Sequence, residues 1–140
     1  MVRKKIKTFT LQEANGLIPE LKKRLKHLQI QKENYSRLHD ALFVHELVCA
    51  AEKSNGFFEE DNLEENIRGL EQAIEDLAKD VEAIFNMGCI LRNIEKGQID
   101  FPAIFNDEKI YWSWEQDEPS ILYYRSCPGG KTGERTLLPS

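Results

Sequence analysis

The chain has 140 residues, of which 41% are apolar and 31% are charged, and this balance is typical of a single globular domain. The composition excludes a collagen-like or a disordered chain. A membrane-spanning chain is excluded because no run of roughly 18 apolar residues occurs. The first seven residues are basic and lack the apolar run of a signal peptide, so we expect a cytoplasmic protein that does not associate with membranes.

Charge is distributed unevenly along the chain. Residues 1–40 contain ten basic and four acidic residues, a net charge of +6, whereas residues 41–140 contain nine basic and twenty acidic ones, a net charge of -11. A basic segment can bind phosphates, or it can pack against an acidic segment of the same fold. Because the overall charge is -5 and no helix-turn-helix pattern occurs, we do not expect nucleic acid as a partner.

The first predicted helix begins at a capping box, in which Thr10 and Glu13 exchange side-chain to backbone hydrogen bonds. Apolar residues then recur three and four positions apart, and over residues 41–51 they cover most of the helix surface. Pro19 is expected to kink this helix after two turns, and Gly56 to end it. The repeat comprises Leu11, Ala14, Ile18, Leu21, Leu25, Leu28, Tyr35, Leu38 and Leu42.

The second predicted helix carries the clearest pattern in the chain, with apolar gaps that alternate between four and three, as in a coiled coil. An acidic cluster at residues 59–61 precedes it, and Gly88 stands where a helix-ending residue belongs. We therefore predict an antiparallel coiled-coil hairpin over about residues 10–87, which brings the basic residues 22–26 near the acidic residues 75–82. The repeat comprises Leu63, Ile67, Leu70, Ile74, Leu77, Val81 and Ile84.

The two predicted helices differ in length, at about 63 Å and about 37 Å for a rise of 1.5 Å per residue. The strands can cover part of the excess of the first helix, and a second copy of the chain can cover the rest. We therefore expect a homodimer that forms through the helices. The alternative is a monomer whose first helix is broken at Pro19.

After Gly88 the apolar period changes to two, and four strands are expected to form an antiparallel meander over residues 89–94, 98–105, 110–115 and 120–126. The resulting apolar face is expected to pack on the first helix around Phe43 and Leu47, and the tail, residues 127–140, to be flexible. Counting back from short turns sets the register. It pairs Phe105 with Ile110, Ala103 with Trp112, Phe101 with Trp114, Trp114 with Ile121, Trp112 with Tyr123, and Leu91 with Phe101.

The opposite face of this predicted sheet carries the candidate site. The same register aligns Arg92, Asp100, Glu115 and Ser120 in one row, with Tyr111, Ser113 and Tyr124 nearby, Arg125 on the apolar side, and Arg135 able to return from the tail. Two opposed carboxylates repel each other, so an arginine, a shared proton or a cation must compensate their negative charges. Three interpretations stay open: a solvated face with salt bridges, a ligand pocket in which Arg92 or Arg135 binds an anion, and acid–base catalysis by the carboxylate pair.

Other motifs carry less information. His39, His45, Glu46 and Cys49 lie close together on one predicted helix, but two ligands a turn apart do not make a metal site, so we expect no metal and no cofactor. The three cysteines, Cys49, Cys89 and Cys127, lack the spacing of a disulfide framework and are expected to be reduced thiols. No phosphate-loop, dinucleotide-binding, serine-hydrolase or zinc-protease motif occurs.

Several motifs give the chain a family resemblance. They are Phe9-Thr-Leu-Gln-Glu-Ala-Asn15, Leu17-Ile-Pro-Glu-Leu21, Gly97-Gln-Ile-Asp-Phe-Pro-Ala103, Tyr111-Trp-Ser-Trp-Glu115 and Glu118-Pro-Ser-Ile121. In these the chain resembles an uncharacterised bacterial family, domain of unknown function 2203, over nearly its whole length. The resemblance implies a small, single-domain cytoplasmic protein and supplies no activity. The chain has Tyr123-Tyr124 where the family suggests a Trp-His pair, and Gly133-Glu-Arg135 in place of a Gly-Arg pair, which argues further against an enzyme.

The sequence thus predicts one α+β domain, with a long two-helix coiled-coil hairpin followed by a small four-stranded antiparallel sheet. We expect a non-enzymatic interaction or assembly module that self-associates through its helices. The alternative is a small-ligand binding protein or small enzyme that uses the polar sheet face. The residues that would bind a ligand there are Arg92, Asp100, Glu115, Tyr124 and Arg135.

Overall fold

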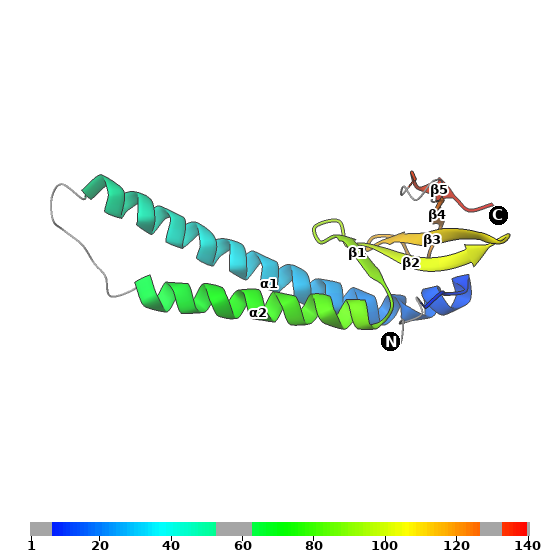
Figure 1. Ribbon diagram of the computed structural model, residues 1–140, viewed down its shortest axis with the longest axis horizontal. Coiled ribbons are helices and arrows are strands. Elements are labelled where there is room, and N and C mark those ends of the chain that lie inside the picture. The colour runs from blue at the N-terminus through cyan, green and yellow to red at the C-terminus, as the bar shows by residue number, and fades with distance from the viewer. Residues whose placement is uncertain (1–6, 53–62, 127–132, 140) are drawn as a thin grey trace, which may run out of the picture.

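In the computed structural model, which describes residues 7–52, 63–126 and 133–139, two helices precede a five-stranded antiparallel sheet (Figure 1). Helices α1 (Leu11–Glu52) and α2 (Leu63–Asn86) lie side by side, and the sheet lies over the end of this pair at which α1 begins. The strands are β1 (Ile90–Asn93), β2 (Gln98–Phe105), β3 (Glu108–Glu115), β4 (Tyr123–Ser126) and β5 (Thr136–Leu137), in that order across the sheet. The predicted α+β class is confirmed, with five strands in place of four.

Helix α1 begins at the predicted capping box. The Glu13 amide donates to Thr10 Oγ1 at 3.1 Å, and the Thr10 amide donates to Glu13 Oε1 at 3.0 Å. These two groups of Thr10 hold the pKa of the Glu13 carboxyl below its usual value. The helix then runs through Pro19 to Glu52 without a break. The predicted helix end at Gly56, the acidic cluster at 59–61, the basic residues 3–5 and Cys127 lie outside the described residues.

The apolar repeat of α2 divides into two rows that differ in burial. Ile84 is fully buried, and Leu63, Leu70 and Leu77, which precede it at intervals of seven, are half-buried. The other row is exposed, with 39% of Ile67, 49% of Ile74 and 37% of Val81 accessible to solvent. A coiled coil buries both rows. The hairpin is therefore present, but coiled-coil packing between α1 and α2 is not confirmed.

The charged residues of the hairpin do not pair as expected. Within the described part of the chain, no ion pair joins the basic residues 22–26 to the acidic residues 75–82. Arg24 instead contacts Glu20 on its own helix, and the polar contact across the hairpin runs from His27 Nδ1 to Asp80 Oδ2 at 2.8 Å. Long exposed side chains gain little from a single ion pair, so proximity alone does not fix one.

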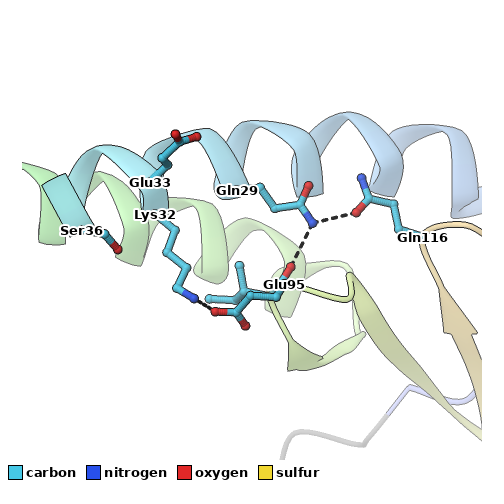
Figure 2. Close-up of a pocket in the computed structure, with 7 residues that line it drawn as sticks. Gln29, Lys32, Glu33, Ser36, Glu95 and Gln116 are labelled. Carbon is cyan, nitrogen blue, oxygen red and sulfur yellow. Dashed lines mark hydrogen bonds and ion pairs between the residues drawn. The ribbon is translucent and has the colours of Figure 1, made fainter.

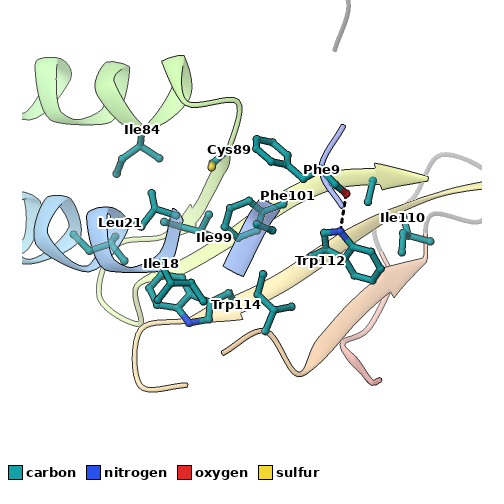
Figure 3. Close-up of a cluster of buried hydrophobic side chains, with 14 of the residues drawn as sticks. Phe9, Ile18, Leu21, Ile84, Cys89, Ile99, Phe101, Ile110, Trp112 and Trp114 are labelled. Carbon is teal, nitrogen blue, oxygen red and sulfur yellow. Dashed lines mark hydrogen bonds between the residues drawn. The ribbon is translucent and has the colours of Figure 1, made fainter. Parts of the chain in front are cut away.

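The core lies between the N-terminal half of α1 and one face of the sheet (Figure 3). The α1 stripe from Ala14 to Leu28 is buried against residues of β2 and β3, including Phe101 and Trp114. Phe43 and Leu47 were predicted to receive the sheet, but they are 55% and 54% exposed. That prediction was wrong because the antiparallel α2 returns the chain to the start of α1 before β1 begins.

The segment before α1 is bonded directly to the sheet. The Phe9 amide donates to the carbonyl of Pro102 at 2.8 Å, and the Phe9 carbonyl accepts a hydrogen bond from Trp112 Nε1 at 2.9 Å (Figure 3). The rings of Phe9 and Phe101 pack edge to face with centroids 5.5 Å apart. Trp112 and Trp114 are both buried on the helix-facing side, as the alternating pattern predicts.

The register between β2 and β3 differs from the predicted one by two residues. Phe105 faces Glu108, Ala103 faces Ile110, and Phe101 faces Trp112. Asn106 and Asp107 have φ values of 51° and 62°, so the connection is a two-residue turn whose twist matches that of the strands, where a four-residue turn was predicted. A shift of two keeps every side chain on its predicted face but changes its partner.

The register between β3 and β4 differs from the predicted one by one residue. Each side chain of β4 therefore lies on the face opposite to the predicted one. Trp112 faces Tyr124 and Tyr111 faces Arg125. The connecting loop is wider than a tight turn because it is anchored elsewhere: the Ile121 amide donates to Asn15 Oδ1 of α1 at 2.8 Å, and Trp114 Nε1 donates to the Glu118 carbonyl at 2.9 Å. At the other edge, Leu91 faces Ile99 where Phe101 was predicted, and a bulge follows at Arg92.

Cys89 is expected to be chemically inert in the folded protein. It is 1% exposed, and burial raises the pKa of its thiol from 9.0 to about 12. A time course with iodoacetamide, followed by mass spectrometry, should modify the half-buried Cys49 well before Cys89. Because the unfolded thiol ionises first, this group should make the fold less stable as the pH rises above about 9. Equal labelling rates for the two thiols would contradict this assignment.

Candidate functional site

Asp100 is the centre of a polar cluster on the sheet face opposite the helices. It lies on β2, an interior strand of the sheet, between the core residues Ile99 and Phe101, and it is 0% exposed. The bulge in β1 directs Arg92 to it, and Arg92 Nε donates to Asp100 Oδ2 at 3.0 Å. Arg125 of β4 brings its own Nε to 3.8 Å from the same oxygen. A buried carboxylate thus has two guanidinium groups beside it, which offsets the cost of its burial.

Arg135 forms a second group beside the first. Its Nε donates to Ser113 Oγ at 2.8 Å, and its Nη2 donates to Glu118 Oε1 at 2.6 Å. Its Nη1 lies 3.6 Å from Glu115 Oε2. The predicted return of Arg135 to the sheet is therefore present, and the strand β5 that follows it pairs with β4. Tail residues 136 and 137 belong to the sheet.

Charge is segregated across this face. Arg92 and Lys109 both lie over the ring of Tyr111, at 5.3 Å and 6.0 Å from its centroid, and the partner of Tyr111 across the strands is Arg125. This group of three cations, with Asp100 as its buried carboxylate, is called the cationic end below. At the other end two carboxylates, Glu115 and Glu118, surround the single guanidinium of Arg135, which also lies 4.2 Å over the ring of Tyr123.

The predicted row of Arg92, Asp100, Glu115 and Ser120 is not formed as such. Asp100 faces Ser113, and Glu115 faces Gln98 two positions along the strand. The row was wrong because it depended on the four-residue turn that the structure replaces with two residues. The two carboxylates are therefore not direct partners that could share a proton, and each is bound to a different arginine.

The structure also changes the membership of the site. Tyr124 lies on the helix-facing side and packs against the core, whereas Arg125, predicted on that side, lies at Asp100. Glu118 opens one of the family motifs but was not predicted to belong to the site. Its carboxylate accepts from the Glu115 amide at 2.8 Å and its own amide donates to the Glu115 carbonyl at 2.9 Å, so it holds the loop closed. An acidic residue beside a Pro-Ser pair in a loop gives no sequence signal for this role.

A polar pocket of about 430 Å³ lies where the sheet meets the middle of α1 (Figure 2). Its groups bind one another: the Gln29 amide donates to the Ile94 carbonyl at 2.9 Å and to Gln116 Oε1 at 2.7 Å, and Lys32 pairs with Glu95. These contacts fasten the β1–β2 turn and the β3–β4 loop to the helix. We assign this pocket a structural role.

A larger apolar groove of about 910 Å³ lies between the start of α1 and the far end of the sheet. It is lined mainly by aromatic and aliphatic residues, including Phe9, Phe105 and Trp112. Its rim carries the exposed side chains of Ile104 and Leu137.

The histidine and cysteine residues of α1 do not form a metal site in the structure. Cys49 Sγ lies 3.5 Å from His45 Nε2, while His39 stacks on Tyr35 one turn earlier. Among residues 7–52, 63–126 and 133–139, no group of three or more His, Cys, Asp or Glu side chains is placed to hold a metal ion. No helix in the described ranges is long and apolar enough to cross a membrane.

Among known proteins, the chain matches a protein family. Neither the curated proteins nor the solved structures include a match to this chain. A family described as an uncharacterized conserved protein, DUF2203, matches residues 7–137, which include both helices, all five strands and every arginine and carboxylate of the polar cluster. The chain therefore belongs to the DUF2203 family.

Proposed function

We propose that this protein is an assembly module that self-associates through its helical hairpin. The observation that carries the proposal is the exposed apolar row on α2, defined here as Ile67, Ile74, Val81 and Phe85. These residues repeat at intervals of seven, seven and four, so they lie on one side of the helix. Their exposures are 39%, 49%, 37% and 67%.

A second exposed apolar surface lies on α1 beyond the sheet. Phe43, Val44, Leu47 and Val48 are all close to half exposed, at 55%, 56%, 54% and 47%. The sheet covers only the N-terminal half of α1, so the part of the hairpin that carries these residues projects from the body of the protein (Figure 1). Both surfaces belong to the helices, which supports an interface along the hairpin.

The physical case for association is the cost of leaving these side chains in water. Burying apolar surface contributes roughly 25 cal/mol per Å², and monomeric proteins rarely keep a large apolar patch exposed. A heptad repeat forms one apolar seam, which is fully buried only when helices cover both of its rows. In the described chain α1 covers one row of α2, and the other row is available to a second helix.

A second copy of the chain is the partner that fits best. An isologous dimer places the same patch of both copies against itself, so each exposed row would find an apolar surface of equal length. The rows are flanked on α2 by charged residues such as Glu71, Glu75 and Lys79, which would form the polar rim of such an interface. Assembly of this kind requires no reacting group.

The proposal is tested by placing a charge in the exposed row. Ile74→Glu should shift the protein to the monomer, because it buries a carboxylate in an apolar contact, while folding of the monomer should persist at a site already 49% exposed. The matched control is Ile104→Glu, the same substitution at a 64% exposed position of the sheet. Size exclusion with light scattering reports the mass of each variant.

The two variants separate the possible outcomes. Dimeric wild type and Ile104→Glu together with monomeric Ile74→Glu would support the hairpin interface. If Ile104→Glu alone became monomeric, the interface would lie on the sheet, and the proposal would fail. A monomeric wild-type protein would also overturn it.

A further inference from the structure

We propose that Arg92 and Arg125, held in place by Asp100, form a binding site for a phosphate group. This inference does not depend on self-association, since it concerns the sheet face and not the hairpin. It rests on three observations: the way Asp100 holds the two arginines, an unpartnered oxygen at the centre of the cluster, and the charge of the cationic end.

Asp100 engages both arginines through the side of the guanidinium group that is nearest the chain. Their Nε atoms lie 3.0 Å and 3.8 Å from the same carboxylate oxygen, Oδ2. Within the described residues, the Nη nitrogens of Arg92 and Arg125 donate no hydrogen bond. The two side chains remain 31% and 18% exposed, so these nitrogens are accessible from outside. Arg92, which is hydrogen-bonded at Nε, presents its remaining N–H groups as a fork for an oxyanion, and Arg125 lies beside it at ion-pair distance from the same carboxylate oxygen.

The second observation is an unpartnered oxygen in a fully buried side chain. Asp100 is 0% exposed, and its Oδ1 accepts no hydrogen bond from the residues that the structure describes. The Nε of Arg125 is likewise buried without a hydrogen-bond partner there. Buried polar atoms are nearly always satisfied, and leaving one unpaired costs about 1–3 kcal/mol. The hydroxyl of hydrogen phosphate can donate a hydrogen bond to Oδ1 once the side chains that cover this oxygen move to admit it, while the other phosphate oxygens face the arginines.

The third observation is the charge balance, which favours phosphate over a carboxylate ligand. Arg92, Arg125 and Lys109 contribute three positive charges at the cationic end, and Asp100 contributes one negative charge. The net positive charge of two matches a phosphate group of about -1.5 to -2 better than a carboxylate of one charge. The charge of Arg135 is already offset by Glu115 and Glu118, so Arg135 is placed outside this site.

Inorganic phosphate is the first probe, added to the full chain at constant ionic strength and followed by the NMR signals of the arginine side chains. Saturable shifts of the Nε–H signals of Arg92 and Arg125, with little change at Arg135, are expected. Arg125→Gln should weaken binding about tenfold or more, because it removes a charge-assisted pair of donors. Arg125→Lys keeps the charge but loses the fork of donors, so its affinity for phosphate should lie between those of the wild type and Arg125→Gln. Arg68→Gln is the control, since Arg68 is 75% exposed on α2 and should not affect binding.

Several results decide the question. Glycerol phosphate that binds at the same arginines with equal or higher affinity supports a site for phosphate esters, whereas binding of inorganic phosphate alone supports a site for the free anion. Acetate that binds as tightly as phosphate would overturn the assignment. So would the absence of a saturable shift in the wild-type protein, or equal phosphate binding by the folded Arg125→Gln variant and the wild type.

Discussion

Phe101→Ala is expected to lower the free energy of unfolding by about 3–5 kcal/mol, the usual cost of removing a buried aromatic ring. Phe101 is 0% exposed at the centre of the core, and its ring packs edge to face on Phe9. Its loss opens a cavity between β2 and the start of α1, and it also weakens the attachment of the segment before the helix. Equilibrium unfolding in urea measures the change.

The same strand offers a matched control for this prediction. Phe105 is also a phenylalanine of β2, but it is 48% exposed and contacts Trp112 only at the edge of the core. Phe105→Ala should therefore cost about 1 kcal/mol, as is usual at a partly exposed position. Equal losses for the two variants would show that the sheet does not pack on α1 through the face that carries Phe101.

Asp100→Ala is expected to destabilise the fold by about 2–3 kcal/mol, because it leaves two guanidinium groups without their shared carboxylate. The cost should fall below that of a fully buried ion pair, since Arg92 is 31% exposed and its charge can turn toward water. Urea unfolding at neutral pH measures this loss.

An exposed aspartate provides the comparison. Asp117 lies on the surface of the loop that follows β3, and Asp117→Ala should change stability by no more than about 0.5 kcal/mol. A small effect at both positions would mean that Arg92 and Arg125 do not depend on Asp100 for their placement. That result would also weaken the argument for a phosphate site.

Local signals in the sequence were sufficient for the helices. The capping box at Thr10 and Glu13 defines the start of α1 through groups only three residues apart. Gly88 has a φ of +90°, which glycine adopts freely, and the chain turns from helix to strand there. The alternation through Trp112 and Trp114 likewise identified the helix-facing side of β3.

The strand partners could not be predicted in the same way, because register depends on the exact length of each turn. Asn106 and Asp107 form a two-residue turn, and this moved the partner of Asp100 from Glu115 to Ser113. The β3–β4 loop is set by contacts with Asn15, which is more than a hundred residues away in the chain. Such contacts exist only once the fold is formed.

For the candidate site too, local sequence signals predicted several of the residues that take part, but not how the strands pair them. The alternation of side chains predicted that Arg92, Asp100 and Glu115 lie on the polar face, and Arg135 was expected to return to it from the tail, but the actual contacts of these residues were not predicted. Arg125 was assigned to the wrong face because an odd change of register exchanges the two sides of a strand. The segment that carries Arg135 was expected to be loose, and the two strand residues after it form β5.

Self-association of the wild-type chain can be measured by sedimentation equilibrium at increasing protein concentration. The chain has a mass of 16.3 kDa. A dimer formed through the hairpin should give an apparent mass that rises to twice this value as the concentration reaches tens of micromolar. A mass that stays at 16.3 kDa throughout that range would contradict self-association.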